Sequence, residues 1–233
     1  MWPKDALRKI SDPSTSEADY ALAVRTLTRE LLVRAKQKKF FPLVGIHVVS
    51  TVADFDLMLA PAAEELEWDK HKTALTCLWP DYQVVLDGVI DVAPIKLAMS
   101  QTSSASMRQL LFVCQSIGTI TELESMAAHV LFEPNEQEYE TIAVLTPVAH
   151  IEAEEQFKMA LPQKYRERLK WIELRRDPKL TTSGVLLPGV AMSNAERAGF
   201  RSFEETSSYV PDIFRSRYNF EKRPKPTSGL SMI

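Results

Sequence analysis

The chain has 233 residues, 45% hydrophobic and 25% charged, so we expect one ordinary globular domain with short extensions. Its formal charge of −3 excludes the overall basic field that general binding to nucleic acid or to an anionic bilayer requires. The longest apolar runs fall well short of the roughly 18 residues of a membrane-spanning helix, and we expect a soluble protein.

The cysteines and the amino terminus indicate an intracellular, reducing compartment. Cys77 and Cys114 each lie inside an apolar stretch, which favours buried free thiols over a disulfide. The first five residues contain a proline and an acid and lack the apolar segment of a secretory signal. We therefore expect a cytoplasmic or mitochondrial protein, and a processed organelle presequence is compatible with this start.

The first third of the chain predicts a long amphipathic helix and then a buried strand. Ser14 and Glu17 stand at capping-box spacing, and apolar residues recur at helical intervals from Tyr20 up to the lysines of 36–39. The next run is nearly all apolar and β-branched, as in a buried parallel strand. The expected elements after the first helix are a strand at 43–49, a helix at 55–66, and strands at 74–78 and 83–86 joined by a turn at 79–81.

The rest of the chain alternates strands with helices, apart from 90–106, which carries no assignment because Pro94 and a Ser/Thr cluster interrupt it. The expected elements are a strand at 109–114, a polar turn at 115–119, a helix at 121–131, a strand at 141–145, a helix at 151–161 and a strand at 169–174. Such alternation predicts an α/β fold with a mostly parallel sheet and flanking helices. Ligands of open sheets bind at the carboxyl ends of the strands, so the turn after Cys114 is the first place to expect a site.

The glycines give little sign of a phosphate-binding loop. There are seven, and no two are adjacent. Enzymes that cradle phosphates with backbone N–H groups use clustered glycines, because the backbone must approach the anion closely.

Three segments of the second half carry a resemblance to a known family. They are LLFVCQSIGTITE at 110–122, AVLTPVAHIE at 143–152 and GVLLPGVAMSNAERAGF at 184–200. In order and spacing they resemble the phosphoribosyl pyrophosphate loop, the following strand and turn, and the uracil-binding hood of the uracil phosphoribosyltransferase family. The resemblance implies a type I phosphoribosyltransferase-like domain at 16–200, an extension at 1–15 and an extended tail at 201–233. If the family's site is retained, the ligand contacts would be Ser116, Gly118, Thr119, Thr121, Pro188 and Gly189.

The departures from the family are concentrated in its functional positions. The acidic residue that helps bind the ribose falls on Val113, and the paired glycines fall near Thr119 and Ile120, whose Cβ atoms would crowd a phosphate. The hood has Ala191 and Met192 where the family has its second glycine and the following Asp, and the pyrophosphate-binding turn has no counterpart at 78–88. We therefore expect a scaffold that has lost its enzymatic site, which favours a non-enzyme over an enzyme.

The function we expect is that of a structural or accessory subunit of a larger protein assembly, for which a mitochondrial complex is one setting. The old ligand face or the terminal extensions would bind other subunits, and a homodimer stays open. We expect no catalytic residue, metal site or cofactor; Mg²⁺ would enter only with a retained phosphoribosyl site. His47 alternates within an apolar strand, which favours a hydrogen-bonded core imidazole over a catalytic base.

Two alternatives remain open from the sequence. The first is a phosphoribosyltransferase or nucleotide-sensing regulator that binds a phosphoribosyl ligand at 116–121. The second is an RNA-associated protein that uses its basic and aromatic tail. The tail residues expected to bind a partner are Arg215, Arg217, Tyr218, Phe220, Lys222 and Arg223.

Overall fold

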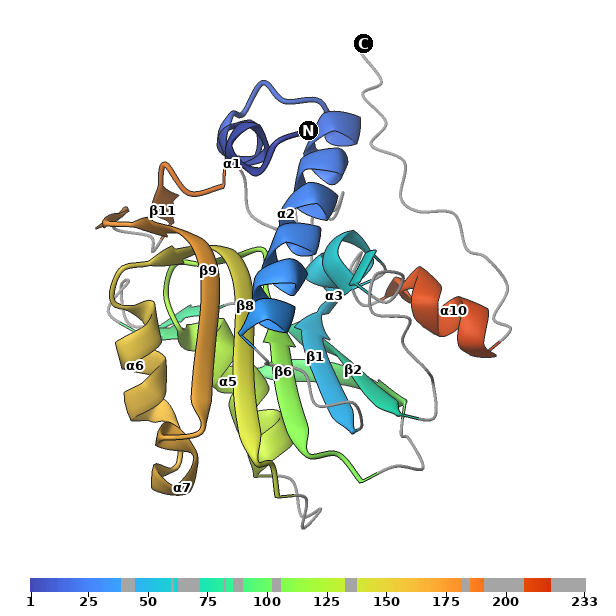
Figure 1. Cartoon of the computed structure of the whole chain (residues 1–233). Helices are drawn as coiled ribbons and strands as arrows, with labels where there is room; N and C mark the ends of the chain where they lie inside the picture. The colour runs from blue at the N-terminus through green and yellow to red at the C-terminus, as the bar shows by residue number, and fades with distance from the viewer. Residues whose placement is uncertain are drawn as a thin grey trace.

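The computed structural model describes residues 1–38, 45–59, 61–62, 72–81, 83–85, 90–101, 106–132, 138–181, 185–190 and 208–218. For residues 83–85, 90–91 and 216–218 it describes the backbone alone. The described residues form one α/β domain in which helices cover both faces of a central sheet (Figure 1). None of the helices in these ranges is long and apolar enough to cross a membrane.

The central sheet has seven strands in the order β5-β2-β1-β6-β8-β7, with β9 also paired to β8. All neighbours are parallel except β5, which runs antiparallel to β2. The strands are β1 (Ile46–Thr51), β2 (Thr73–Pro80), β5 (Ile95–Gln101), β6 (Gln109–Val113), β7 (Ser116–Ile117), β8 (Thr141–His150) and β9 (Leu169–Asp177). The expected α/β class with a mostly parallel sheet and flanking helices is confirmed.

Several strands run further than the sequence predicts. β2 continues through Trp79 and Pro80, the expected turn, because these residues pair with β5 across a bulge that accommodates the proline. β5 itself lies in the segment without an assignment. β8 and β9 continue to His150 and Asp177 because their parallel pairing extends to those residues.

Two small antiparallel pairs and the helices complete the fold. The pairs are β3 (Gln83–Val85) with β4 (Ile90–Val92), and β10 (Lys179–Leu180) with β11 (Leu186–Leu187). The helices are α1 (Pro3–Ser11), α2 (Glu17–Gln37), α3 (Val52–Asp54), the π-helix η1 (Phe55–Leu59), α5 (Thr121–Leu131), α6 (Ala153–Ala160), α7 (Gln163–Arg166) and α10 (Asp212–Tyr218).

Alternate residues of the strands belong to two hydrophobic cores, one on each face of the sheet. On one face, Val48 and Leu111 pack under α2 together with α1, η1 and Phe214. On the other, Val49 and Phe112 pack under α5 and α6. Near-continuous apolar strands are the pattern of a sheet buried on both sides.

The amino-terminal helix α1 was not expected. It begins with Pro3 in its first turn, places Asp5 near its positive end, and buries Ala6 and Ile10 in the same core cluster as α2. Residues 1–15 are therefore packed against the domain. α2 is capped by Ser16, whose Oγ accepts a hydrogen bond from the backbone N of Asp19 at 3.2 Å, and not by the predicted Ser14, because the helix begins at Glu17.

Part of the tail also packs on the domain. Phe214 of α10 is fully buried, with its ring centroid 5.2 Å from that of Phe55 in η1. The Tyr209 hydroxyl donates to Asp56 Oδ2, and the backbone N of Asp212 donates to Asp56 Oδ1 at 2.9 Å. The segment 208–218 thus lies against the π-helix of its own chain.

We expect Phe214→Ala to lower the free energy of unfolding by roughly 3 kcal/mol, because it removes a buried ring from the contact between α10 and η1. Urea denaturation followed by tryptophan fluorescence measures the loss. Phe132→Ala is the matched control, since Phe132 is 71% exposed and its removal leaves the core intact. Equal losses in the two variants would contradict the docking of α10.

Candidate functional site

The sheet has a topological switch point between β1 and β6. The chain leaves β1 for β2 on one side, whereas β6 lies on the other side and leads on to β8. Open α/β sheets bind ligands in the crevice at such a point, outside the carboxyl ends of the strands. The segments at the carboxyl ends of β1 and β6, at 51–54 and 114–120, are therefore the candidate site.

Three buried side chains from three elements meet there. The Tyr20 hydroxyl of α2 donates to Gln115 Oε1 at 2.7 Å, and the backbone N of Gln115 donates to Asp54 Oδ2 at 3.2 Å. Each residue is at most 1% exposed. The crevice of the switch point is thus filled, at these positions, by side chains of the chain itself.

Burial controls the protonation of this cluster. Removal from water and, to a smaller extent, the nearby Glu122 carboxylate together raise the pKa of Asp54 to about 8, against the hydrogen bonds from Gln115 and Thr51. The pKa of Glu122 is also raised, to about 7, by burial. Asp54 is therefore mostly protonated at neutral pH, and a neutral carboxyl is a poor ligand for Mg²⁺.

The predicted phosphate loop is a paired strand followed by a helix. Ser116 and Ile117 form β7 and pair with Val148 and Ala149 of β8, in place of the expected polar turn. Of the three glycines that the structure describes, Gly45 and Gly189 have positive φ and Gly118 does not. The loop therefore makes no use of the backbone freedom of Gly118.

The amino terminus of α5 already holds acidic side chains. Thr121 is its first residue, Ile120 precedes it without a side-chain cap, and Glu122 and Glu124 lie in the first turn. A helix amino terminus attracts anions through its dipole and free N–H groups. Here two carboxyl groups of the chain occupy that field and oppose a phosphate.

The hood residues Pro188 and Gly189 lie beyond the end of β9, held by an ion pair. Arg175 Nε lies 2.8 Å from Asp177 Oδ1, and Asp177 Oδ2 accepts the Gly189 N–H at 2.8 Å. Arg175 Nη2 donates to the Gly189 carbonyl at 2.8 Å, and Nη1 donates to Ser11 Oγ at 3.0 Å. The backbone of Gly189 is engaged within the chain and tied to α1. Ala191 and Met192 lie outside the described residues.

Arg175 and Asp177 were missed in the sequence, where the Arg-Arg-Asp run at 175–177 reads as an ordinary charged strand end. Their importance depends on β9 reaching Asp177, three residues beyond the predicted end. Asp177 is buried, and its partner is Arg175, so the pair costs less than an isolated charge would. The ion pair positions the hood.

His47 is a hydrogen-bonded core imidazole, as predicted. Its Nδ1 lies 2.7 Å from the Tyr139 hydroxyl, and its Nε2 lies 2.8 Å from Thr76 Oγ1, which in turn contacts Ser100 Oγ at 2.9 Å. Burial lowers the pKa of His47 to about 4, so the ring stays neutral at physiological pH.

The cysteines are free and buried, as predicted. Burial raises the pKa of both thiols, and for Cys114, at the exit of β6, Asp54 and Glu122 add to the effect. Neither thiol is suited to act as a nucleophile. Within the described residues, no group of three or more His, Cys, Asp or Glu side chains could hold a metal ion.

The tail residues expected to bind a partner are divided. Arg215 is 6% exposed, lies with its guanidinium 5.1 Å from the Tyr209 ring centroid and forms an ion pair with Asp212, so its side chain serves the fold. Arg217 and Tyr218 belong to α10, but their side chains lie outside the described residues. Phe220, Lys222 and Arg223 also lie outside them.

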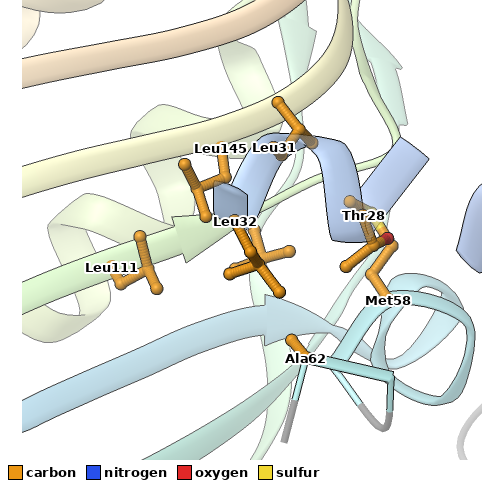
Figure 2. Close-up of a pocket in the computed structure, with 8 residues that line it drawn as sticks. Thr28, Leu31, Leu32, Met58, Ala62, Leu111 and Leu145 are labelled. Atoms are coloured by element: carbon orange, nitrogen blue, oxygen red, sulfur yellow. The ribbon is translucent and has the colours of Figure 1, made fainter. Parts of the chain in front are cut away.

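A small cavity lies beneath α2 (Figure 2). Its volume is about 10 Å³, roughly that of one water probe, and its lining is apolar apart from Thr28, whose hydroxyl donates to the Val24 carbonyl at 2.9 Å. The lining residues are Thr28, Leu31, Leu32, Met58, Ala62, Leu111, Val113 and Leu145. This void is a packing defect too small for a nucleotide.

Asp54→Asn tests the buried cluster. Because the carboxyl binds a proton more tightly in the folded chain, its contribution to stability is present below about pH 4 and is lost as the pH rises toward 8. The wild type should lose on the order of 1–3 kcal/mol between pH 5 and 9, and Asp54→Asn should lose less. Urea denaturation at several pH values measures this, with Asp5→Asn as the exposed control. An unchanged pH dependence in Asp54→Asn would refute the role of Asp54.

Gly189→Ala tests the hood turn. Gly189 has a φ of +50°, and a Cβ there would stand 2.2 Å from the Leu186 carbonyl oxygen, so the variant should lose about 1–3 kcal/mol of stability. Gly118→Ala is the matched control, because Gly118 does not have a positive φ, and it should lose less than about 1 kcal/mol. Thermal melting of both variants makes the comparison; a Gly118→Ala loss equal to that of Gly189→Ala would contradict the difference in backbone.

Comparison with known proteins gives a fold but no family. No protein-family model matches the chain, and no curated protein matches it in sequence. The AQ2163 protein from Aquifex aeolicus is similar in structure, with a TM-score of 0.64 and 12% identity over 86% of this chain and 95% of that chain. At this identity the likeness concerns the fold alone.

Two phosphoribosyltransferase structures are similar at lower scores. A hypoxanthine phosphoribosyltransferase from Staphylococcus aureus has a TM-score of 0.44 and 11% identity over 67% of this chain and 74% of that chain. An adenine phosphoribosyltransferase from Leishmania donovani has a TM-score of 0.41 and 14% identity over 64% of each chain. Because both TM-scores are below 0.5, these two likenesses carry no argument about the function of this chain.

Proposed function

We propose that this chain is a non-catalytic subunit of a protein assembly, built on a phosphoribosyltransferase-like scaffold. The observation that carries the proposal is the Tyr20–Gln115–Asp54 cluster, buried and hydrogen-bonded at the switch point where an open sheet would take its ligand. A ligand in that place would have to displace buried side chains that are hydrogen-bonded to one another, although Asp54 Oδ1 and Gln115 Nε2 have no hydrogen-bond partner among the described residues.

The electrostatics of the same place favour this proposal over a phosphoribosyl-binding site. Transfer of a phosphoribosyl group depends on positive charge and metal ions that stabilise a pyrophosphate. The first turn of α5 instead carries Glu122 and Glu124, and negative charge there opposes a polyanion. Asp54 beside them is mostly protonated at neutral pH and supplies no positive charge.

The scaffold itself is supported by order and spacing. Strands β2, β1, β6, β8 and β9 lie side by side in a parallel order with one switch point. The sequence segments 110–122, 143–152 and 184–200 follow one another in the order of the uracil phosphoribosyltransferase family. Such a fold hosts many functions, so the function has to come from the surfaces that the chain exposes. Both terminal segments that the structure describes, 1–15 and 208–218, pack onto this scaffold and add to those surfaces.

A thermal-shift titration tests the proposal. Phosphoribosyl pyrophosphate with Mg²⁺, and separately uracil and uridine monophosphate, should leave the melting temperature unchanged at millimolar concentration. A ligand at about 100 times its dissociation constant would add roughly 2.7 kcal/mol of stability, which such a titration detects.

A retained site would give a different result. A rise in melting temperature that Thr121→Ala abolishes and Glu152→Gln leaves in place would overturn the proposal. Turnover of the ligand would then identify an enzyme, and binding without turnover a sensor.

A further inference from the structure

An open cleft lies between α1 and the turn at Pro188. Figure 1 shows α1 and β11 at the same end of the molecule. Its volume is about 490 Å³, and its walls come from α1, from Arg175 of β9 and from Pro188. This volume is within the range of ordinary binding pockets. The candidate site at 51–54 and 114–120 contributes none of its lining residues.

Two cations of α1 face this cleft without partners. Lys4 and Arg8 lie one turn apart, both are exposed and both line the cleft. Neither side chain makes an ion pair or a hydrogen bond with any residue that the structure describes. Lys9, on the same helix, is by contrast paired with Asp19 at 2.8 Å.

The acidic groups of the cleft are already engaged. Asp12 Oδ1 accepts hydrogen bonds from the backbone N and the hydroxyl of Ser14, at 2.8 and 2.6 Å. Asp177 lies behind the cleft in its ion pair with Arg175. The three cations Lys4, Arg8 and Arg175 against these two carboxylates leave a net charge of +1 (3 − 2), carried by α1 on the open side.

The floor of the cleft is preformed. Arg175 ties β9 to α1 through Ser11 and to the hood through Gly189, and Ser11 Oγ itself donates to the Gly189 carbonyl at 2.6 Å. Binding to a rigid surface loses less conformational entropy than binding to a loose one. The floor of the cleft around Arg175, Ser11 and Gly189 is therefore held in place by the chain itself.

Apolar groups accompany the charges. Leu7 and Pro188 lie in the walls. Val185 and Leu187, in the segment that leads into Pro188, are 49% and 46% exposed. Apolar area beside cationic side chains is typical of surfaces that bind proteins.

We infer that this cleft is the docking site for an acidic peptide segment, with apolar side chains, of a partner protein. The inference rests on the proposed function, because it names a surface through which the subunit would join its assembly. Complementary charge would come from Asp or Glu side chains opposite Lys4 and Arg8, and apolar side chains would lie against Leu7 and Pro188.

Two other occupants are less well matched. A membrane surface would need an apolar helix face to insert, but Ala6 and Ile10 of α1 are buried in the core. A small free anion would need an enclosing set of donors, whereas the most buried cation, Arg175, donates to groups of its own chain.

Peptide selection on the full chain tests the inference. Random peptides of about 12 residues, displayed on phage, are selected on the wild type, and the recovered sequences are titrated against it as labelled peptides. We expect enrichment in Asp and Glu. The Kd should rise about 10-fold or more in the double variant Lys4→Glu/Arg8→Glu and should also rise with salt concentration.

The matched control is Arg25→Glu/Lys72→Glu, which reverses two positive charges that do not line the cleft. It should bind the peptides as the wild type does, and all three proteins should have the same circular dichroism and melting behaviour. Recovered peptides without acidic enrichment, or with equal affinity for the two double variants, would overturn the inference.

Two further arms separate the other occupants. If no acidic peptides are recovered and the wild type, but not Lys4→Glu/Arg8→Glu, co-sediments with phosphatidylserine vesicles, the occupant of the cleft is a membrane surface and not a peptide. A thermal shift with inorganic phosphate that the same variant abolishes would replace it with a small anion. Either result overturns the docking site alone, whereas a shift with phosphoribosyl pyrophosphate that depends on Thr121 overturns the proposed function.

Discussion

The hydrogen bonds among Tyr20, Gln115 and Asp54 fill the place where an open α/β sheet commonly binds its ligand. They connect the covering helix α2 to the ends of the two strands that flank the switch point. Buried polar groups must find partners, because an unsatisfied one costs roughly 1–3 kcal/mol. Here Gln115 joins Tyr20 to Asp54, whereas Asp54 Oδ1 and Gln115 Nε2 have no hydrogen-bond partner among the described residues. The place that commonly receives a ligand is occupied by side chains of the chain itself.

A second set of contacts fixes the amino-terminal helix α1 to the domain. The ion pair of Arg175 and Asp177 holds the hood and, through Ser11, the amino-terminal helix. The carboxyl-terminal helix α10 is held in a similar way, by Phe55 and Asp56 of the π-helix that directly follows Asp54. Both terminal segments are thereby fixed to elements around the carboxyl ends of the strands, and they form part of the protein surface there.

Periodicity predicted the elements that depend on local pattern. The helix at 121–131 and the cores of the parallel strands β1, β2, β6, β8 and β9 follow directly from the apolar pattern, and the alternation of strands and helices predicted the class of the fold. Strand ends were less predictable, because β8 and β9 extend each other by pairing across about 30 residues of sequence. The helix α1 was missed because its apolar face is narrow, and it is stabilised by burial of Ala6 and Ile10 against α2.

The sequence predicted where the candidate site lies but not which residues form it. The turn after Cys114 does lie at the switch point, but Asp54 and Tyr20, which come from 61 and 95 residues away, respectively, join it only through the fold. No local motif marks either residue. The same holds for Arg175 and Asp177, whose roles depend on the contact between β9 and α1.

The antiparallel strand β5 bears on how this chain can associate. It forms one edge of the sheet, and most of its side chains are exposed or half-exposed. Lys96 lies near its beginning, directly after the Pro94-Ile95 step, and pairs with Asp81. Lysine and proline at an edge discourage a further strand from continuing the sheet. Growth of an assembly by shared β-structure is therefore disfavoured at this edge, and a neighbour would have to recognise side chains.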